Sequence, residues 1–108
     1  MRSLLAEVQE LVADGRARVS EHGFRELKED AIHLANVVQG LARAQTVEEY
    51  PEYHNGPSVP VLQRDAKDRP IHALWGMSKA NRDEAVLITA YRPDPARWSA
   101  DFLRRLPK

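Results

Sequence analysis

The chain has no cysteine among its 108 residues. This absence excludes disulfides, thiolate metal sites and a cysteine nucleophile, and it fits a reducing compartment. Long apolar runs are also missing, because the N-terminal stretch MRSLLAEVQELVADGR places acidic residues among its apolar ones. We therefore expect neither a signal peptide nor a membrane span, and we expect a soluble cytoplasmic protein.

Several motifs that carry chemistry are absent as well. The histidines His22, His54 and His72 are far apart, and no HxH, HExxH or cysteine pair supplies metal-ligand spacing. The sequence has no phosphate-cradling glycine loop, no nucleophile elbow and no dinucleotide fingerprint. We therefore expect no metal ion and no other cofactor.

The formal net charge is zero, but the charge is unevenly distributed. Residues 1–53 carry six Lys/Arg and ten Asp/Glu, whereas residues 54–108 carry ten and six. Such asymmetry is typical of an anion-facing or nucleic-acid-facing surface. On charge alone an ordinary mixed surface is the favoured explanation, since no run reaches five like charges.

The length predicts one domain, covering residues 1–108, with a single modest core. Apolar residues at helical spacing predict a first helix within residues 1–15, ended by Asp14-Gly15. Ser20 is a suitable N-cap for a short helix that runs to Lys28. Asp30 then predicts the start of a third helix that ends near Gly40.

Four strands follow in the predicted order. They are expected at residues 44–50, 59–64, 70–76 and 85–91, with Pro60 limiting the second to an edge, an end or a bulge. Asp94-Pro95 then predicts a C-terminal helix with Trp98 and Phe102 on its apolar face. Helices that precede sequential strands indicate an α+β domain with a mainly antiparallel four-stranded sheet.

The stretch from Arg69 to Trp98 is the first place to look for chemistry. His72 lies inside one predicted strand, while Tyr91 and Arg92 lie at the end of the next. Pairing of these strands would bring an imidazole, a phenol and a guanidinium together. On alternation, His72 shares a sheet face with Leu74 and Gly76.

Four segments carry a resemblance to a known family. They are HGF at a helix start, EEYP, PIHALW on a strand and VLITAYRPDPARW at the end. Together they resemble the DUF4258 family of small bacterial proteins, over residues 19–105, and the first helix lies outside the shared pattern. Members of that family are similar in layout to RelE/ParE-like ribonuclease toxins, which cleave RNA without metal and place helices before a four-stranded antiparallel sheet.

Carried over by position, the resemblance falls on six residues, namely His22, Tyr50, His72, Tyr91, Pro93 and Trp98. One difference from the toxins concerns charge. Many RelE-like ribonucleases are strongly basic because they hold a polyanion, and this chain is neutral. The neutral charge argues against tight RNA binding.

The leading functional hypothesis is a metal-independent ribonuclease or toxin-like nuclease of a toxin-antitoxin system. Such chemistry needs a proton acceptor, a proton donor and a cation for the phosphate, which His, Tyr and Arg supply. The candidate catalytic residues are His72, His22 and Tyr91. The candidate substrate-binding residues are Arg92, Arg64 and Arg69. RNA and a small antitoxin are the expected partners.

Each candidate also has a structural interpretation. His72 fits a half-buried strand histidine with a neighbouring hydrogen-bond partner, His22 fits a residue that bonds to backbone at a helix start, and Tyr91 fits an anchor for the C-terminal helix. Arg92 is explained equally as surface charge. The alternative function is a non-catalytic protein-interaction domain with a RelE-like fold, which the neutral charge and the extra N-terminal helix favour.

Overall fold

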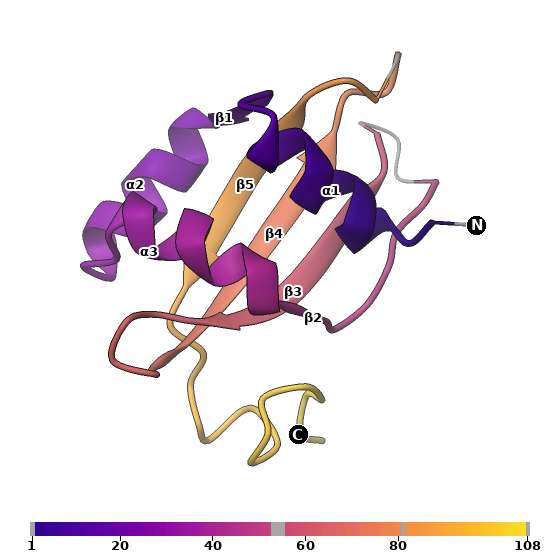
Figure 1. Cartoon of the computed structure of the whole chain (residues 1–108). Coiled ribbons are helices and arrows are strands. Elements are labelled where there is room, and N and C mark those ends of the chain that lie inside the picture. Colours follow the sequence, from indigo (N-terminus) through magenta and orange to yellow (C-terminus); the bar gives the residue numbers. More distant parts are fainter. Residues whose placement is uncertain (1, 53–55, 81, 108) are drawn as a thin grey trace.

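The computed structural model describes residues 2–52, 56–80 and 82–107. In this part of the chain, three α-helices lie against one five-stranded sheet, which gives a mixed α+β fold (Figure 1). The helices are α1 (Leu4–Ala13), α2 (Glu21–Glu29) and α3 (Leu34–Gly40), followed by the 3-10 turn η1 (Leu41–Arg43). None of the described helices has the length and hydropathy that crossing a membrane requires.

The sheet has the strand order β1-β5-β4-β3-β2. Its strands are β1 (Ala17–Val19), β2 (Gln45–Thr46), β3 (Ser58–Arg64), β4 (Pro70–Met77) and β5 (Ala85–Tyr91). The pairs β2–β3, β3–β4 and β4–β5 are antiparallel, whereas β1 runs parallel to β5. The prediction of four strands is therefore wrong by one, because the three residues of β1 are too few to show a period in the sequence.

Alternation along the strands sets the core. Ile71, Ala73 and Trp75 on β4 are almost fully buried against the helices. From the helices, the core takes Leu4, Leu5, Val8, Leu27, Val37 and Leu41. The buried Gln63 crosses this core, because its amide nitrogen donates to the Val37 carbonyl at 2.6 Å and its amide oxygen accepts from the Trp75 indole at 3.4 Å.

The start of the third helix differs from the prediction. Ala31 has a φ of 53°, a left-handed conformation that a helix does not tolerate, and α3 begins only at Leu34. Asp30 instead ends α2, and its carboxylate accepts a hydrogen bond from the Arg92 backbone N–H at 2.8 Å. The residue that resembled a helix cap therefore joins α2 to the end of β5.

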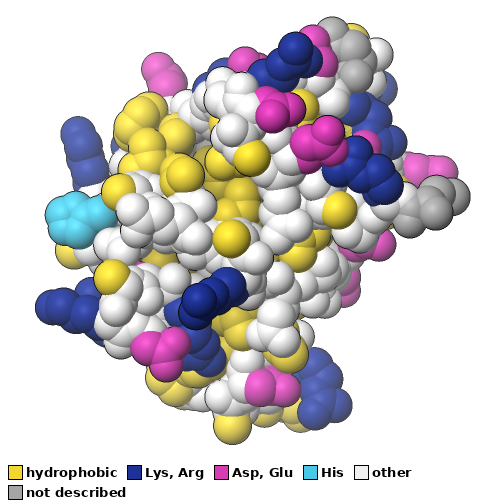
Figure 2. Space-filling model, in the orientation of Figure 1, with side chains coloured by type: hydrophobic (Ala, Val, Ile, Leu, Met, Phe, Trp, Pro, Cys, Tyr) yellow, Lys and Arg dark blue, Asp and Glu magenta, His cyan; other side chains and the backbone are white. Residues whose placement is uncertain are grey.

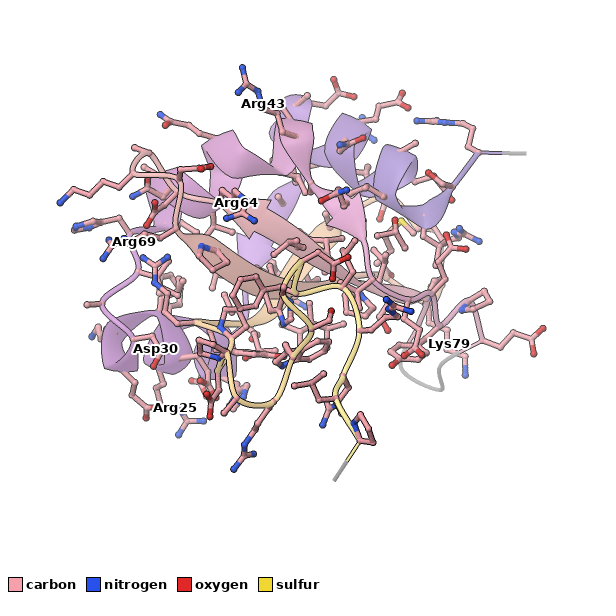
Figure 3. The ribbon with its side chains drawn as sticks, turned by 90° about the horizontal axis from the view of Figure 1, so that it is seen from below. Arg25, Asp30, Arg43, Arg64, Arg69 and Lys79 are labelled. Atoms are coloured by element: carbon pink, nitrogen blue, oxygen red, sulfur yellow. The ribbon has the colours of Figure 1, made fainter. Side chains whose placement is uncertain are left out.

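The predicted C-terminal helix is wrong. Asp94 does bond to a nearby amide, that of Ala96, but residues 93–107 form a series of turns. The side chains of Ser99 and Asp101 accept hydrogen bonds from the backbone N–H groups of Arg104 and Leu103, which competes with helix formation. This C-terminal segment (residues 93–107) lies beside the sheet, on the side away from α1 and α3 (Figures 1 and 3).

Candidate functional site

His72 lies on the sheet face opposite the helices, as its alternation with Ile71 and Ala73 predicts. It is only 4% exposed, because the C-terminal segment covers it. The imidazole meets the Trp98 ring edge-on, at 4.3 Å between ring centroids, and the Tyr91 ring at 5.5 Å. Strand pairing thus brings His72 and Tyr91 together, and the C-terminal segment keeps the imidazole out of contact with solvent.

The hydrogen bonds of His72 define its tautomer. Its Nε2 lies 2.8 Å from the Phe102 carbonyl oxygen, which only accepts, so Nε2 carries the proton and donates. In the neutral ring, Nδ1 then accepts from the Tyr91 hydroxyl at 3.4 Å, a long and weak bond. Both ring nitrogens therefore make hydrogen bonds within the protein. The direct effect of His72 is on the Tyr91 hydroxyl and not on a substrate.

Burial also fixes how His72 responds to pH. It lowers the pKa of His72 below the ordinary value of 6.5; the Phe102 carbonyl opposes this shift and the Arg105 guanidinium adds to it. Below about pH 6.5 the unfolded chain then binds more protons at this site than the folded chain does. The free energy of unfolding should fall as the pH drops below about 6.5. Above that pH, His72 should not make the free energy of unfolding depend on pH.

We expect this pH dependence of the free energy of unfolding to come from His72 and not from the exposed His33. Urea unfolding midpoints at about pH 7.5 and about pH 5.5 should differ less in His72→Gln than in the wild type. The exposed His33, which makes no side-chain cap bond to α3, provides the control, since His33→Ala should keep the wild-type difference. An equal difference in His72→Gln and wild type would contradict this account.

His22 lies on α2, which packs against β5. It lies in the first turn of α2, whose N-cap Ser20 accepts from the Gly23 N–H and donates to the Ile88 carbonyl of β5, each at 2.9 Å. His22 Nε2 is 3.2 Å from the Glu26 carboxylate, and its side chain is 57% exposed. Burial raises the pKa of Tyr91, and Glu26 is close enough to raise it further. Glu26 therefore pairs with the exposed histidine and also adds negative charge that acts on the phenol.

Arg105 brings a positive charge to this region. Its guanidinium lies over the Trp98 ring, 5.2 Å from the centroid, and it lowers the pKa values of Tyr91 and Tyr50 against the effects that raise them. Arg105 could not be identified from a local pattern, because its place depends on how the turns after Asp94 fold. The interpretation of Trp98 as part of a helix face was wrong; Trp98 is half-buried and packs on His72.

The candidate phosphate-binding arginines have partners within the protein. The Asp65 carboxylate, 2% exposed, accepts from the Arg92 guanidinium at 2.8 Å and from Arg69 Nε at 3.0 Å. Arg92 also donates to the Pro70 carbonyl at 3.2 Å. Arg64 donates to the Asp68 carbonyl at 3.1 Å. All three arginines lie around the β3–β4 turn, where Figure 3 labels Arg64 and Arg69.

The charge at the surface follows the neutral composition. Figure 2 shows basic and acidic side chains scattered over the same face of the molecule. Within the described residues, no group of three or more His, Asp or Glu is placed to hold a metal ion. His54, one of the three histidines that are far apart in the sequence, lies outside the described residues.

A comparison with protein-family models finds one matching family. Residues 19–92 match the model named Domain of unknown function (DUF4258), which covers well over half of the chain. The chain belongs to the DUF4258 family. Searches of curated proteins and of solved structures found no match. Within this DUF4258 chain, α1 and the C-terminal segment lie outside the matched residues, whereas His22, Glu26, His72 and Tyr91 lie inside them.

Proposed function

We propose that this DUF4258 chain is a metal-independent ribonuclease of the RelE/ParE-like kind that acts on cytoplasmic RNA, with His22, Tyr91 and Arg105 as its reactive groups. The observations that carry the proposal are two contacts, His22 with Glu26 at 3.2 Å and His72 with the Tyr91 hydroxyl at 3.4 Å, and the Arg105 guanidinium over the Trp98 ring that packs on His72. They supply an imidazole paired with a carboxylate, a phenol and a guanidinium. A small antitoxin is the partner such a nuclease would need.

The reaction follows from these groups. His22, held by Glu26, takes the proton of a ribose 2′-hydroxyl, and the 2′-oxygen then attacks the adjacent phosphorus. The bond from phosphorus to O5′ breaks, which gives a 2′,3′-cyclic phosphate. The leaving O5′ takes the Tyr91 proton, and water then carries the proton that His22 gained back to the Tyr91 oxygen, so that both groups return to their starting states. Arg105 balances the charge that develops on the phosphate oxygens.

His72 has a positioning role in this proposal. Its tautomer, fixed by the Phe102 carbonyl, leaves Nδ1 as an acceptor that holds the Tyr91 hydroxyl in place. Because the bond of 3.4 Å is weak, the hydroxyl can turn from Nδ1 to the leaving oxygen when RNA binds. The raised pKa of Tyr91 keeps the phenol protonated near neutral pH.

Loss of His22 should abolish the activity. We expect His22→Ala to lower the rate of RNA cleavage by about 100-fold or more, because it removes the general base. The measurements are growth and total-RNA integrity after induced expression, followed by cleavage of RNA with the purified chain. His33→Ala is the matched control, since it removes an exposed histidine from α3 instead of α2.

Two results would contradict the proposal. One is cleavage by folded His22→Ala at the wild-type rate, with folding checked by circular dichroism. The other is a folded wild type that leaves RNA intact and growth unaffected. Tyr91→Phe keeps the buried ring and removes only the hydroxyl, so it separates a chemical role of Tyr91 from a packing role.

The second candidate function is a non-catalytic interaction domain. It is favoured by the exposed apolar side chains Phe24 and Val38, at 50% and 43%, on α2 and α3. An interaction domain should be harmless when expressed alone, whereas a nuclease should slow growth. The expression experiment therefore decides between the two functions.

A further inference from the structure

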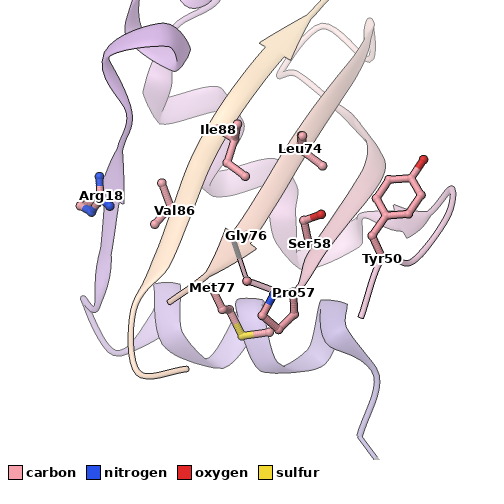
Figure 4. Close-up of a pocket in the computed structure, with 10 residues that line it drawn as sticks. Arg18, Tyr50, Pro57, Ser58, Leu74, Gly76, Met77, Val86 and Ile88 are labelled. Carbon is pink, nitrogen blue, oxygen red and sulfur yellow. The ribbon is translucent and has the colours of Figure 1, made fainter. Parts of the chain in front are cut away.

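A groove lies on the sheet face opposite the helices (Figure 4). Leu74 and Gly76 of β4 and Val86 and Ile88 of β5 line it, with Tyr50 on one side and Arg18 on the other (Figure 4). Its volume is about 400 Å³. That is the lower end of the range for small-molecule sites, so the groove suits one compact ligand group.

The floor of the groove is apolar, and no side chain fills it at Gly76. A Cβ at this position would lie 2.8 Å from Ile88 Cδ1. Arg18, at the rim, is the one charged residue among those that line the groove in the described part of the chain, and its guanidinium is bonded to Glu84 at 2.9 Å. The groove therefore favours a flat, uncharged ligand group.

Ser58 supplies a polar group within this apolar surface. The residue is 3% exposed, and Figure 4 shows its hydroxyl pointing into the groove. Its backbone N–H and carbonyl are both paired with Tyr50, at 3.0 and 2.8 Å. Among the described residues the hydroxyl has no hydrogen-bond partner. A ligand with a hydrogen-bond donor or acceptor at this position would gain affinity by bonding to the Ser58 hydroxyl. An apolar side chain of a partner protein would instead bury that hydroxyl without a hydrogen bond.

We propose that the groove binds one nucleobase of a single-stranded RNA, next to the phosphate that is cleaved. Tyr50, whose ring is 43% exposed, stacks on the base, and the Ser58 hydroxyl bonds to the base edge. The groove adjoins His72 and Tyr91, because Leu74 lies two residues from His72 on the same face of β4 and Ile88 lies three residues before Tyr91 on β5. This inference rests on the proposed function for its substrate class.

A binding measurement without cleavage tests the inference. The full-length chain is titrated with each of the four nucleoside 3′-monophosphates, while the methyl signals of Leu74, Val86 and Ile88 are followed by NMR. We expect at least one nucleotide to shift these signals at millimolar concentration or below, and inorganic phosphate to leave them unchanged. Tyr50→Ala should weaken the nucleotide by about 5-fold or more, since stacking is lost.

Matched variants make the result specific. Phe24→Ala, which removes a similarly exposed aromatic ring from α2, should bind as the wild type does. Ser58→Ala should weaken the preferred nucleotide by about 3-fold to 10-fold, because its hydroxyl is replaced by a methyl hydrogen. Equal weakening in Tyr50→Ala and Phe24→Ala would overturn the inference.

The inference and the proposed function can fail separately. His33→Ala, which changes an exposed histidine at the N-cap of α3, should keep the wild-type affinity for the nucleotide. Nucleotide binding in the groove by a chain that cleaves no RNA would support the inference and remove the nuclease. No shift of the three methyl signals with any nucleotide would overturn the inference even if RNA is cleaved. Shifts with N-acetyl-leucine amide and with no nucleotide would overturn it in favour of a protein ligand.

Discussion

Replacing Trp75 with alanine should lower the free energy of unfolding by about 3 to 5 kcal/mol. Trp75 is among the largest fully buried side chains of the chain, at 2% exposure, and it lies in the middle strand of the sheet against the helices. Its removal leaves a cavity and also takes the indole donor from the buried Gln63. This loss is a large part of the whole free energy of unfolding of a small protein, which is about 5 to 15 kcal/mol.

The other tryptophan provides the control. Trp98 is half-buried between His72 and Arg105, so Trp98→Ala should cost less in the same urea unfolding measurement. If Trp75→Ala fails to fold, Trp75→Phe retains most of the volume and should still shift the midpoint downward. A larger loss of stability in Trp98→Ala than in Trp75→Ala would contradict the assignment of the core to the helix-facing side of the sheet.

Replacing Asp65 with asparagine should lower the free energy of unfolding by about 2 to 4 kcal/mol. The carboxylate accepts from the backbone N–H groups of Lys67 and Arg69, each at 2.9 Å, and from the side chains of Arg69 and Arg92. The uncharged amide would lose the pairing with both guanidinium groups. Asp68→Asn is the control, because that side chain is 88% exposed.

The pH dependence of stability provides a second measurement on Asp65. Burial by itself raises the pKa of Asp65, but the Arg69 amide, the Arg92 guanidinium and the Lys67 amide outweigh it and hold the pKa at about 2, against 3.8 ordinarily. The unfolded chain therefore binds the proton first, so the stabilisation is complete above pH 3.8 and is lost as the pH falls toward 2. Asp65→Asn should unfold in acid with a shallower dependence over that range. The same dependence in wild type and Asp65→Asn would contradict the role of these bonds.

Local patterns predicted the parts of the fold that depend on neighbouring residues. The alternation in Pro70–Met77 placed His72 and Trp75 on opposite faces of the sheet, and the structure confirms this. Strand β1 could not be predicted from such a pattern, because it has only three residues. They pair with β5, which is far away in the sequence, so that Ala17 lies opposite Ala85. Its pairing is decided by tertiary packing and leaves no local period.

The site was predictable in its residue types and less so in its connections. His22 and Tyr91 were read from the sequence, but Glu26 was not, although its spacing of four residues from His22 on a helix is a readable signal. Arg92 and Arg69 were predicted to bind substrate, and the sequence analysis did not identify Asp65, four residues before Arg69, as the partner of both. Arg105 left no signal, because it reaches the site only when the turns at Ser99 and Asp101 bring it over Trp98.

The shortness of β1 and β2 limits how this chain can associate with others. These edge strands have three and two residues. Beyond β1, the Ser20 N–H and hydroxyl bond to the Leu87 and Ile88 carbonyls; beyond β2, the Val47 N–H bonds to the Pro60 carbonyl. In the described part of the chain, little edge is left for an incoming strand to extend the sheet. Partners and substrates must therefore be recognised by side chains on the faces of the molecule, and the folded chain should resist edge-to-edge aggregation.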